Sequence, residues 1–129
     1  MATFSPRSDA HLATTHPDLQ RVLRGVVQHY DCVVLEGART EAQQAENVHK
    51  GVSKTMDSRH LDTPARAVDA APWPIDWKDK DRFYHFGGFV QGYAAALGIP
   101  LTWGGDWDSD RTFRDQTFHD LPHFELPRG

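Results

Sequence analysis

Two segments that lie far apart in the chain carry residue types that together could bind and use a metal ion. His60 and Asp69 belong to the first segment, and Asp120 and His123 to the second. A catalytic zinc site needs three protein ligands and an open position for water, and a carboxylate beside that water commonly acts as general base. His60, Asp69 and His123 can supply the ligands, and Asp120 the base. The sequence therefore predicts a small zinc hydrolase with one Zn²⁺ ion.

Two further carboxylates leave the assignment of ligand and base open. Eight residues separate His60 from Asp69, and Asp62 within this interval is a rival for the third ligand. Glu125 is the other candidate for the base. In a strand it would share a face with His123, so it could instead orient His123 or a neighbouring group. For Asp120 itself, the alternative role is that of a turn or capping residue.

Polar residues upstream are candidates for substrate binding. Arg39 follows a predicted strand, where a guanidinium could hold a substrate carboxylate or stabilise the oxyanion of a tetrahedral intermediate. A surface ion pair with Glu41 is the alternative role for Arg39. The other candidates for hydrogen bonds to a peptide substrate are Gln43 or Gln44, Ser53 and Ser58.

An acidic segment suggests a second metal hypothesis. Asp106, Asp108 and Asp110 alternate along the chain as in the first half of a calcium-binding loop. The sixth position is Arg111 and the twelfth is Thr117, where an EF-hand has Gly and Glu, so this is not an EF-hand loop. A solvated acidic turn is the simpler interpretation, and a Ca²⁺ site is the alternative.

The elements that must position these residues alternate between helices and short strands. Apolar residues recur at helical spacing in two segments, a third segment is predicted as a polar helix that Gly51 ends, and short apolar runs indicate strands. Residues 1–16 are polar, and we expect them to be loosely ordered, with at most a first turn near Ser8–Leu12. We predict an α+β fold with a small antiparallel sheet, helices packed on one side and the zinc site on the sheet. The predicted helices are 18–30, 41–49 and 80–97, and the predicted strands are 32–35, a short one at His60, 67–71, 101–103 and 123–126.

Composition limits the classes of function. The 129 residues fit a single catalytic domain over 1–129, and no apolar run is long enough to span a membrane. The N-terminus lacks the features of a signal peptide. A net charge of −4 gives no general attraction to nucleic acid or anionic membranes. We therefore expect a monomer with neither nucleic-acid partner nor stable membrane association, and a buried, inert Cys32.

The order of these motifs resembles the zinc D-alanyl-D-alanine and L-alanyl-D-glutamate peptidase family. Ser58-x-His60, Ala67-x-Asp69 and Asp120-x-x-His123 follow that family's pattern over about residues 20–127. The endings Gly104-Gly105-Asp106-Trp107 and 122–126 are similar to its phage endolysin branch. The interval from His60 to Asp69 is longer than in the family and lacks the family's Gly.

The resemblance implies a function and a place of action. It makes Asp69 the third ligand and Arg39 the substrate-binding, electrophilic arginine. It implies an endolysin that binds bacterial peptidoglycan and cleaves the L-alanyl–D-glutamate bond of its stem peptides. Such an enzyme has no separate wall-binding domain and leaves the host cytoplasm after a holin opens the membrane. The alternatives are a D-alanyl-D-alanine carboxypeptidase or dipeptidase of the same family, and a catalytically silent peptidoglycan-binding module.

Overall fold

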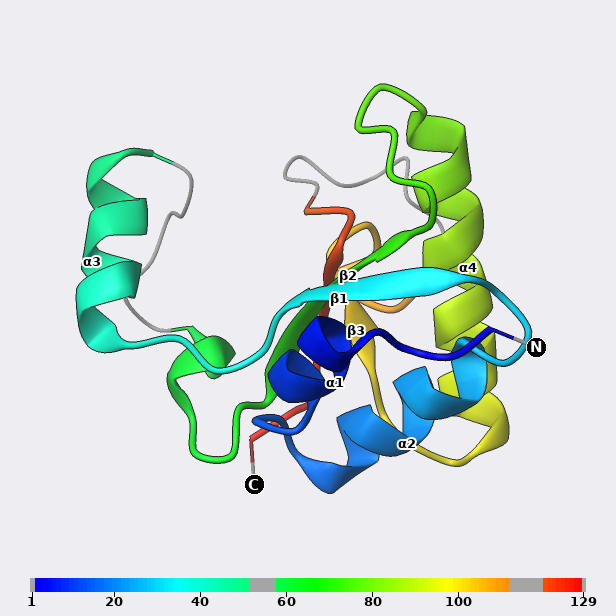
Figure 1. Ribbon diagram of the computed structural model, residues 1–129, viewed down its shortest axis with the longest axis horizontal. Helices are drawn as coiled ribbons and strands as arrows, with labels where there is room; N and C mark the ends of the chain where they lie inside the picture. The colour runs from blue at the N-terminus through cyan, green and yellow to red at the C-terminus, as the bar shows by residue number, and fades with distance from the viewer. Residues whose placement is uncertain (1, 52–57, 112–119, 129) are drawn as a thin grey trace.

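The computed structural model describes residues 2–51, 58–111 and 120–128. Within these ranges the chain forms helices around a four-stranded antiparallel sheet (Figure 1). This arrangement confirms the predicted α+β class. The elements in chain order are α1 (Pro6–Leu12), α2 (Pro17–Val26), β1 (Cys32–Glu36), α3 (Glu41–His49), the 3₁₀ turn η1 (Arg59–Leu61), β2 (Ala67–Pro72), α4 (Lys80–Ala96), β3 (Thr102–Trp103) and β4 (His123–Glu125).

The register of the sheet brings polar residues from three strands together. The strand order is β1-β2-β4-β3, and each neighbouring pair is antiparallel. Asp69 of β2 lies opposite His123 of β4 and, on its other side, opposite Glu36 of β1. Residues that face each other across antiparallel strands project their side chains from the same face. The pairing therefore gathers these three side chains on one face of the sheet.

The other face of the sheet carries the apolar core. Val68 and Phe124, the neighbours of Asp69 and His123 along their strands, are fully buried. Because successive side chains of a strand point to opposite faces, these two residues face the helices while the polar pair faces away. Helices α2 and α4 lie together in Figure 1, and α3 is set apart from them. The core residues from α2 and α4 are Leu19, Val22, Leu23, Val26, Phe86, Val90 and Ala94.

The N-terminal segment is more ordered than its composition suggested. The expectation that residues 1–16 are loosely ordered is wrong, because Pro6–Leu12 form α1 and Leu12 is fully buried. The side chain of Ser5 caps this helix by accepting a hydrogen bond from the amide of Ser8. The hydroxyl of Ser8 in turn accepts from the amide of Val34 at 3.1 Å. Helix α1 thus covers a backbone donor of the edge strand β1, a tertiary contact that no periodicity reveals.

The predicted strand at His60 is also wrong. His60 lies in the 3₁₀ turn η1, where its amide donates to the Ser58 side chain at 3.2 Å. Its carbonyl accepts from the amide of Arg39 at 2.9 Å, so the turn is fixed to the chain that follows β1 instead of to a strand ladder. The remaining predicted elements are present, α3 with the predicted ends and the others with shifted ends. The largest shift is in α2, which ends at Val26, where the amides of Gln28 and His29 bond three residues back.

Two expectations from composition can be compared with the structure. Cys32 is buried, and burial, followed by the charge of Asp31, raises the pKa of its thiol to about 12. A thiol with this pKa stays protonated and inert at neutral pH, as predicted. Among the described residues, no helix has the length and apolar character needed to cross a membrane.

Candidate active site

Three predicted ligands from separate elements meet on the polar face of the sheet. His60 comes from η1, Asp69 from β2 and His123 from β4. The distance from Asp69 Oδ1 to His60 Nε2 is 3.4 Å, and the distance from the same oxygen to His123 Nδ1 is also 3.4 Å. One ligand atom from each of the three residues lies within 4.8 Å of the other two. The three donors surround one point, as a single metal ion requires.

The rival ligand Asp62 lies elsewhere. Its carboxylate accepts hydrogen bonds from Arg128 Nε at 2.9 Å and from Arg128 Nη2 at 3.1 Å. Arg66 lies 3.9 Å from the same carboxylate. The structure therefore brings Asp69, and not Asp62, to the two imidazoles.

The chemistry of the buried donors fits a cation. Among the described residues, His60 Nε2 and Asp69 Oδ1 are buried side-chain atoms without a hydrogen-bond partner. Leaving such atoms unsatisfied is energetically unfavourable. The other ring nitrogen of His60, Nδ1, lies 2.7 Å from the carbonyl oxygen of Gly37 and must donate to it. This bond places the proton on Nδ1 and leaves the lone pair of Nε2 directed at the centre of the cluster.

Glu125 orients the second imidazole. Its Oε1 lies 2.7 Å from His123 Nε2, so that nitrogen donates and Nδ1 is left to face Asp69. The other carboxylate oxygen, Oε2, accepts from the guanidinium of Arg59. A carboxylate behind a ligating histidine is the usual partner that sets its tautomer and orientation. This contact confirms the interpretation that Glu125 orients His123.

The electrostatics of the cluster favour a charged Asp69. Burial opposes ionisation of Asp69, but the adjacent imidazoles of His123 and His60 outweigh it and hold the pKa of Asp69 well below its ordinary value. Burial likewise opposes protonation of His123, yet Asp69 and Glu125 raise the pKa of His123 to about 9. The Asp69 carboxylate thus attracts positive charge to the centre of the three side chains. A metal cation bound there would replace the proton that His123 otherwise holds.

Asp120 lies at the rim of the cluster. Its Oδ2 is 4.0 Å from His123 Nδ1, and 40% of its side chain is exposed. Burial, followed by the negative charge of Asp69, raises the pKa of the Asp120 carboxyl. The backbone fixes this position, because the Asp120 amide donates to Gly104 and its carbonyl accepts from His123. Asp120 can therefore reach both the cluster and a molecule bound beside it.

Arg39 is closely engaged with protein groups. Its Nε donates to Glu36 Oε1 at 2.8 Å, its Nη2 also contacts Glu36, and its Nη1 donates to Gln44 Oε1 at 2.5 Å. Nη2 lies 3.7 Å from Asp69 Oδ2, and only 10% of the side chain is exposed. Its carboxylate partners are Glu36 and Asp69, so the surface pair with Glu41 is not the arrangement observed. The guanidinium therefore approaches the cluster through Oδ2 of Asp69, the oxygen that does not face the imidazoles.

Of the other residues predicted to bind substrate, two have local structural contacts. Gln43 forms a capping box with Thr40 at the start of α3, and the Ser58 side chain caps η1. Ser53 lies outside the described residues. Sequence reasoning missed the roles of Gln44, which is fully buried beside Arg39, and of Arg59. The contact of Arg59 with Glu125 joins segments 66 residues apart, and the bond of Gln44 to Arg39 depends on how the chain turns between β1 and α3.

The acidic loop also reaches the site. Carboxylate oxygens of Asp106, Asp108 and Asp110 lie within 4.8 Å of one another. Asp106 is buried and accepts hydrogen bonds from Gln91 Nε2 at 3.1 Å and from two loop amides, at 3.0 and 3.2 Å. The same loop places the ring of Trp107 5.4 Å from that of His123. The contacts within the loop explain its shape without an ion, and the Ca²⁺ hypothesis stays a prediction.

Two imidazoles and a carboxylate around one point, with a second carboxylate at the rim, are the groups that a metal-dependent hydrolase would use. Comparisons with known proteins narrow this class. A family model described as phage L-alanyl-D-glutamate peptidase matches residues 1–127. The L-alanyl-D-glutamate peptidase of Escherichia phage T5 is 34% identical over 134 residues, which cover 95% of this chain and 96% of that protein.

Two further relatives agree with this match. The L-alanyl-D-glutamate peptidase of Listeria phage A118 is 32% identical over 103 residues, which cover 74% of this chain and 30% of that protein. The crystal structure of the Serratia marcescens L-Ala D-Glu endopeptidase ChiX matches with a TM-score of 0.77 and 34% identity, covering 97% of this chain and 90% of that chain. The chain belongs to the phage L-alanyl-D-glutamate peptidase family, and it is a peptidase.

The geometry predicts which aspartate binds the metal. Asp69→Asn should reduce zinc affinity by more than the roughly 10- to 100-fold that loss of an outer-shell partner produces, because it removes a charged ligand. Asp62→Asn should leave the affinity unchanged, since Asp62 bonds Arg128. Competition with a chromogenic chelator measures both variants. Equal losses in the two would contradict the assignment of Asp69.

A second prediction concerns the support of His123. Glu125→Gln should reduce zinc affinity by about tenfold or more, because the neutral amide holds the imidazole less firmly and makes it less basic. Glu46→Gln, which removes an exposed partner of Lys50, is the matched control and should bind zinc as the parent does. If the two variants bound zinc equally well, Glu125 would not support the ligand.

Proposed function

We propose that this protein is a zinc-dependent endopeptidase that hydrolyses the L-alanyl–D-glutamate bond of bacterial peptidoglycan stem peptides. The observation that carries the proposal is the convergence of His60, Asp69 and His123 beside Asp120. It occurs in a chain whose relatives over nearly its whole length are named for that bond.

The donor set supports zinc as the metal. Two imidazoles and one carboxylate are a familiar ligand set of catalytic zinc, and three protein ligands leave a position open. When bound there, zinc would polarise the scissile carbonyl and lower the pKa of a water molecule. His60 and His123 would each bind through the nitrogen that their outer hydrogen bonds leave free. Asp69 would supply the negative charge.

Asp120 is the proposed general base and acid. A carboxylate at this position can accept a proton from the attacking water and return it to the leaving amine. Its partial exposure gives it access to substrate, and its 4.0 Å distance from His123 keeps it beside the reacting centre. Glu125 is less suited to this task because both of its oxygens are engaged, one with His123 and the other with Arg59.

Arg39 stays a proposed functional residue, and its contacts favour a positioning role over direct binding of substrate. The predicted role was to hold a substrate carboxylate or to stabilise an oxyanion. The bonds to Glu36 and Gln44 and the approach to Asp69 favour a positioning role, in which Arg39 holds Asp69 in place. Gln43, Ser53 and Ser58 stay proposed substrate contacts.

The biological setting follows from the relatives. Two of them are phage proteins, which supports an endolysin that acts on the host cell wall after release from the cytoplasm by a holin. The family match over 1–127 supports a single catalytic domain within these residues. We include a monomeric state in the proposal.

Mass spectrometry of digested peptidoglycan tests the reaction. Purified protein loaded with zinc should release stem peptides that begin with D-glutamate, and a chelator should abolish the release. Release of free D-alanine would instead indicate a carboxypeptidase. If zinc were bound and no fragments appeared, the protein would be a silent binding module.

If Asp120 is the general base, removing its charge should lower turnover without weakening zinc binding. Asp120→Asn should keep zinc affinity near that of the parent and lower kcat by about 10²–10⁴-fold, the usual contribution of a general base. His123→Ala should lose zinc and activity together. Parallel zinc titrations and rate measurements make the comparison. Loss of zinc in Asp120→Asn would make Asp120 a ligand, and full activity would remove it from the mechanism.

A further inference from the structure

A pocket adjoins the active site on the side of Asp120. It has a volume of about 310 Å³ and is lined by Trp77, Lys80, Phe83, Asp120, Leu121 and Pro122. The ring of Trp77 stacks on that of Phe83, with centroids 5.2 Å apart and planes inclined by 18°. Phe83 is buried, whereas Trp77 is 59% exposed. The pocket therefore offers an apolar wall to a molecule that also reaches Asp120.

Lys80 brings a positive charge to this pocket. Lys80 is the first residue of α4 and is exposed. Asp79 and Asp81 on either side of Lys80 do not line the pocket, so their carboxylates are not among the groups that face a ligand there. Asp79 instead caps α4 by accepting from the amide of Arg82 at 3.3 Å. The ammonium group of Lys80 is thus available to a ligand.

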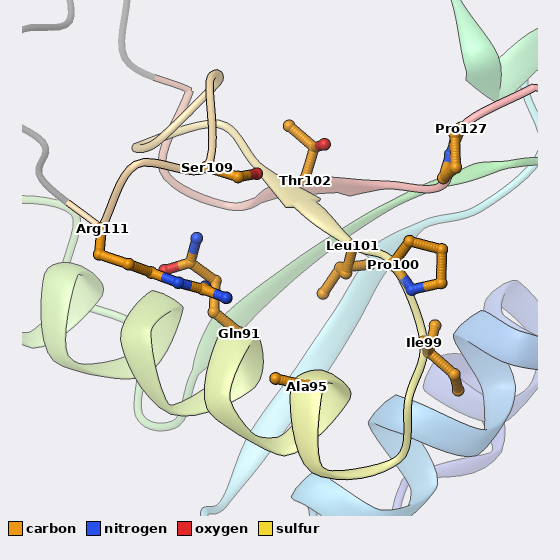
Figure 2. Close-up of a pocket in the computed structure, with 9 residues that line it drawn as sticks. All are labelled: Gln91, Ala95, Ile99, Pro100, Leu101, Thr102, Ser109, Arg111 and Pro127. Carbon is orange, nitrogen blue, oxygen red and sulfur yellow. The ribbon is translucent and has the colours of Figure 1, made fainter.

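A second cavity does not share these properties. It has a volume of about 370 Å³ and lies between α4 and β3, where Figure 2 shows Arg111 reaching toward Gln91. Neither Asp120 nor any member of the metal-type cluster lines it. The pocket at Lys80 is therefore the better candidate for a part of the substrate.

The chemistry of the leaving residue decides what this pocket must hold. This step rests on the proposed function, in which Asp120 returns a proton to the nitrogen of D-glutamate. In the stem peptide D-glutamate is joined onward through its γ-carboxyl group, so its α-carboxylate is free and is attached to the same carbon as the leaving nitrogen. A substrate that places this nitrogen at Asp120 also brings a negative charge close to the Asp120 carboxylate, whereas the charge of Asp69 would be offset by the metal that it binds.

That negative charge needs a cation nearby. Like charges in a partly buried site repel each other strongly. Arg39, the cation beside Asp69, is already bonded to Glu36 and Gln44. Lys80 lines the same pocket as Asp120 and can meet the carboxylate there.

We propose that the pocket beside Asp120 is the subsite of the leaving D-glutamyl residue. Lys80 pairs with the free α-carboxylate, and the Trp77–Phe83 stack contacts the methylene groups that lead to the γ-carbonyl. Lys80 is then a residue that determines specificity. It favours stem peptides that carry D-glutamate over those in which the α-carboxylate is amidated to give D-isoglutamine.

The test compares two substrates and two lysine variants. The substrates are muramyl tripeptides that contain either D-glutamate or D-isoglutamine, and the variants are Lys80→Met and the control Lys78→Met. Lys78 is exposed, does not line the pocket and carries the same charge two residues away. Lys80→Met should lower kcat/KM about three- to tenfold on the D-glutamate substrate, mainly through KM, as expected for one partly exposed charge pair. It should leave the D-isoglutamine substrate unaffected.

Binding of the product supplies a second measurement. Calorimetry with γ-D-glutamyl-L-lysine should show a similar loss of affinity in Lys80→Met and none in Lys78→Met. Trp77→Ala should weaken cleavage of both muramyl tripeptides alike, because the apolar wall contacts groups that they share.

The outcomes separate the subsite from the reaction. If the parent cleaves the D-glutamate substrate but Lys80→Met matches Lys78→Met, or loses activity equally on both substrates, the subsite is wrong and the proposed function stands. If the zinc-loaded parent cleaves neither substrate, the proposed function is wrong and the subsite is rejected with it.

Discussion

The buried carboxylate of Asp69 is the constraint around which the rest of the site is arranged. It lies between His60 and His123, each with a nitrogen 3.4 Å from Oδ1, and Arg39 approaches its other oxygen. Burying a carboxylate is unfavourable unless positive charge and hydrogen bonds compensate. Each group that surrounds Asp69 is itself held by a second partner, and the fold provides these partners from different elements.

The outer contacts decide which atoms face the centre. The carbonyl of Gly37 takes the Nδ1 proton of His60, and Glu125 takes the Nε2 proton of His123, so the two imidazoles present different nitrogens to the same point. Strand pairing places Asp69 directly opposite His123, and the apolar core behind them includes Val68 and Phe124. A packed core limits the movement of the strands, which keeps the cluster preorganised for a cation.

Negative charge also shapes what the site can accept. Asp120 lines the pocket, and the bond named for the relatives contains D-glutamate, so a carboxylate of the substrate and that of Asp120 would repel each other in the proposed reaction. Lys80 at the pocket beside Asp120 would offset this repulsion, and the exposed ring of Trp77 adds an apolar surface. The subsite proposed for the leaving residue therefore combines a positive charge with an apolar wall.

The sequence by itself determined the residue types of the site and most of the elements. His60, Asp120 and His123 could be selected from their types and order, together with a third ligand at Asp69 or Asp62, and the helix of α4 could be predicted from its apolar periodicity, which is a local property. The tertiary structure decided what depends on distant segments. It chose Asp69 over Asp62 as the partner of the imidazoles, turned the expected strand at His60 into η1, and ordered α1 against β1. It also engaged Arg39 with Glu36 and Gln44. The first three outcomes rest on hydrogen bonds and burial between segments that are remote in the chain, about which spacing carries no information. The partners of Arg39 are near it in sequence, but its choice of Glu36 over Glu41 depends on how the chain turns beside Asp69.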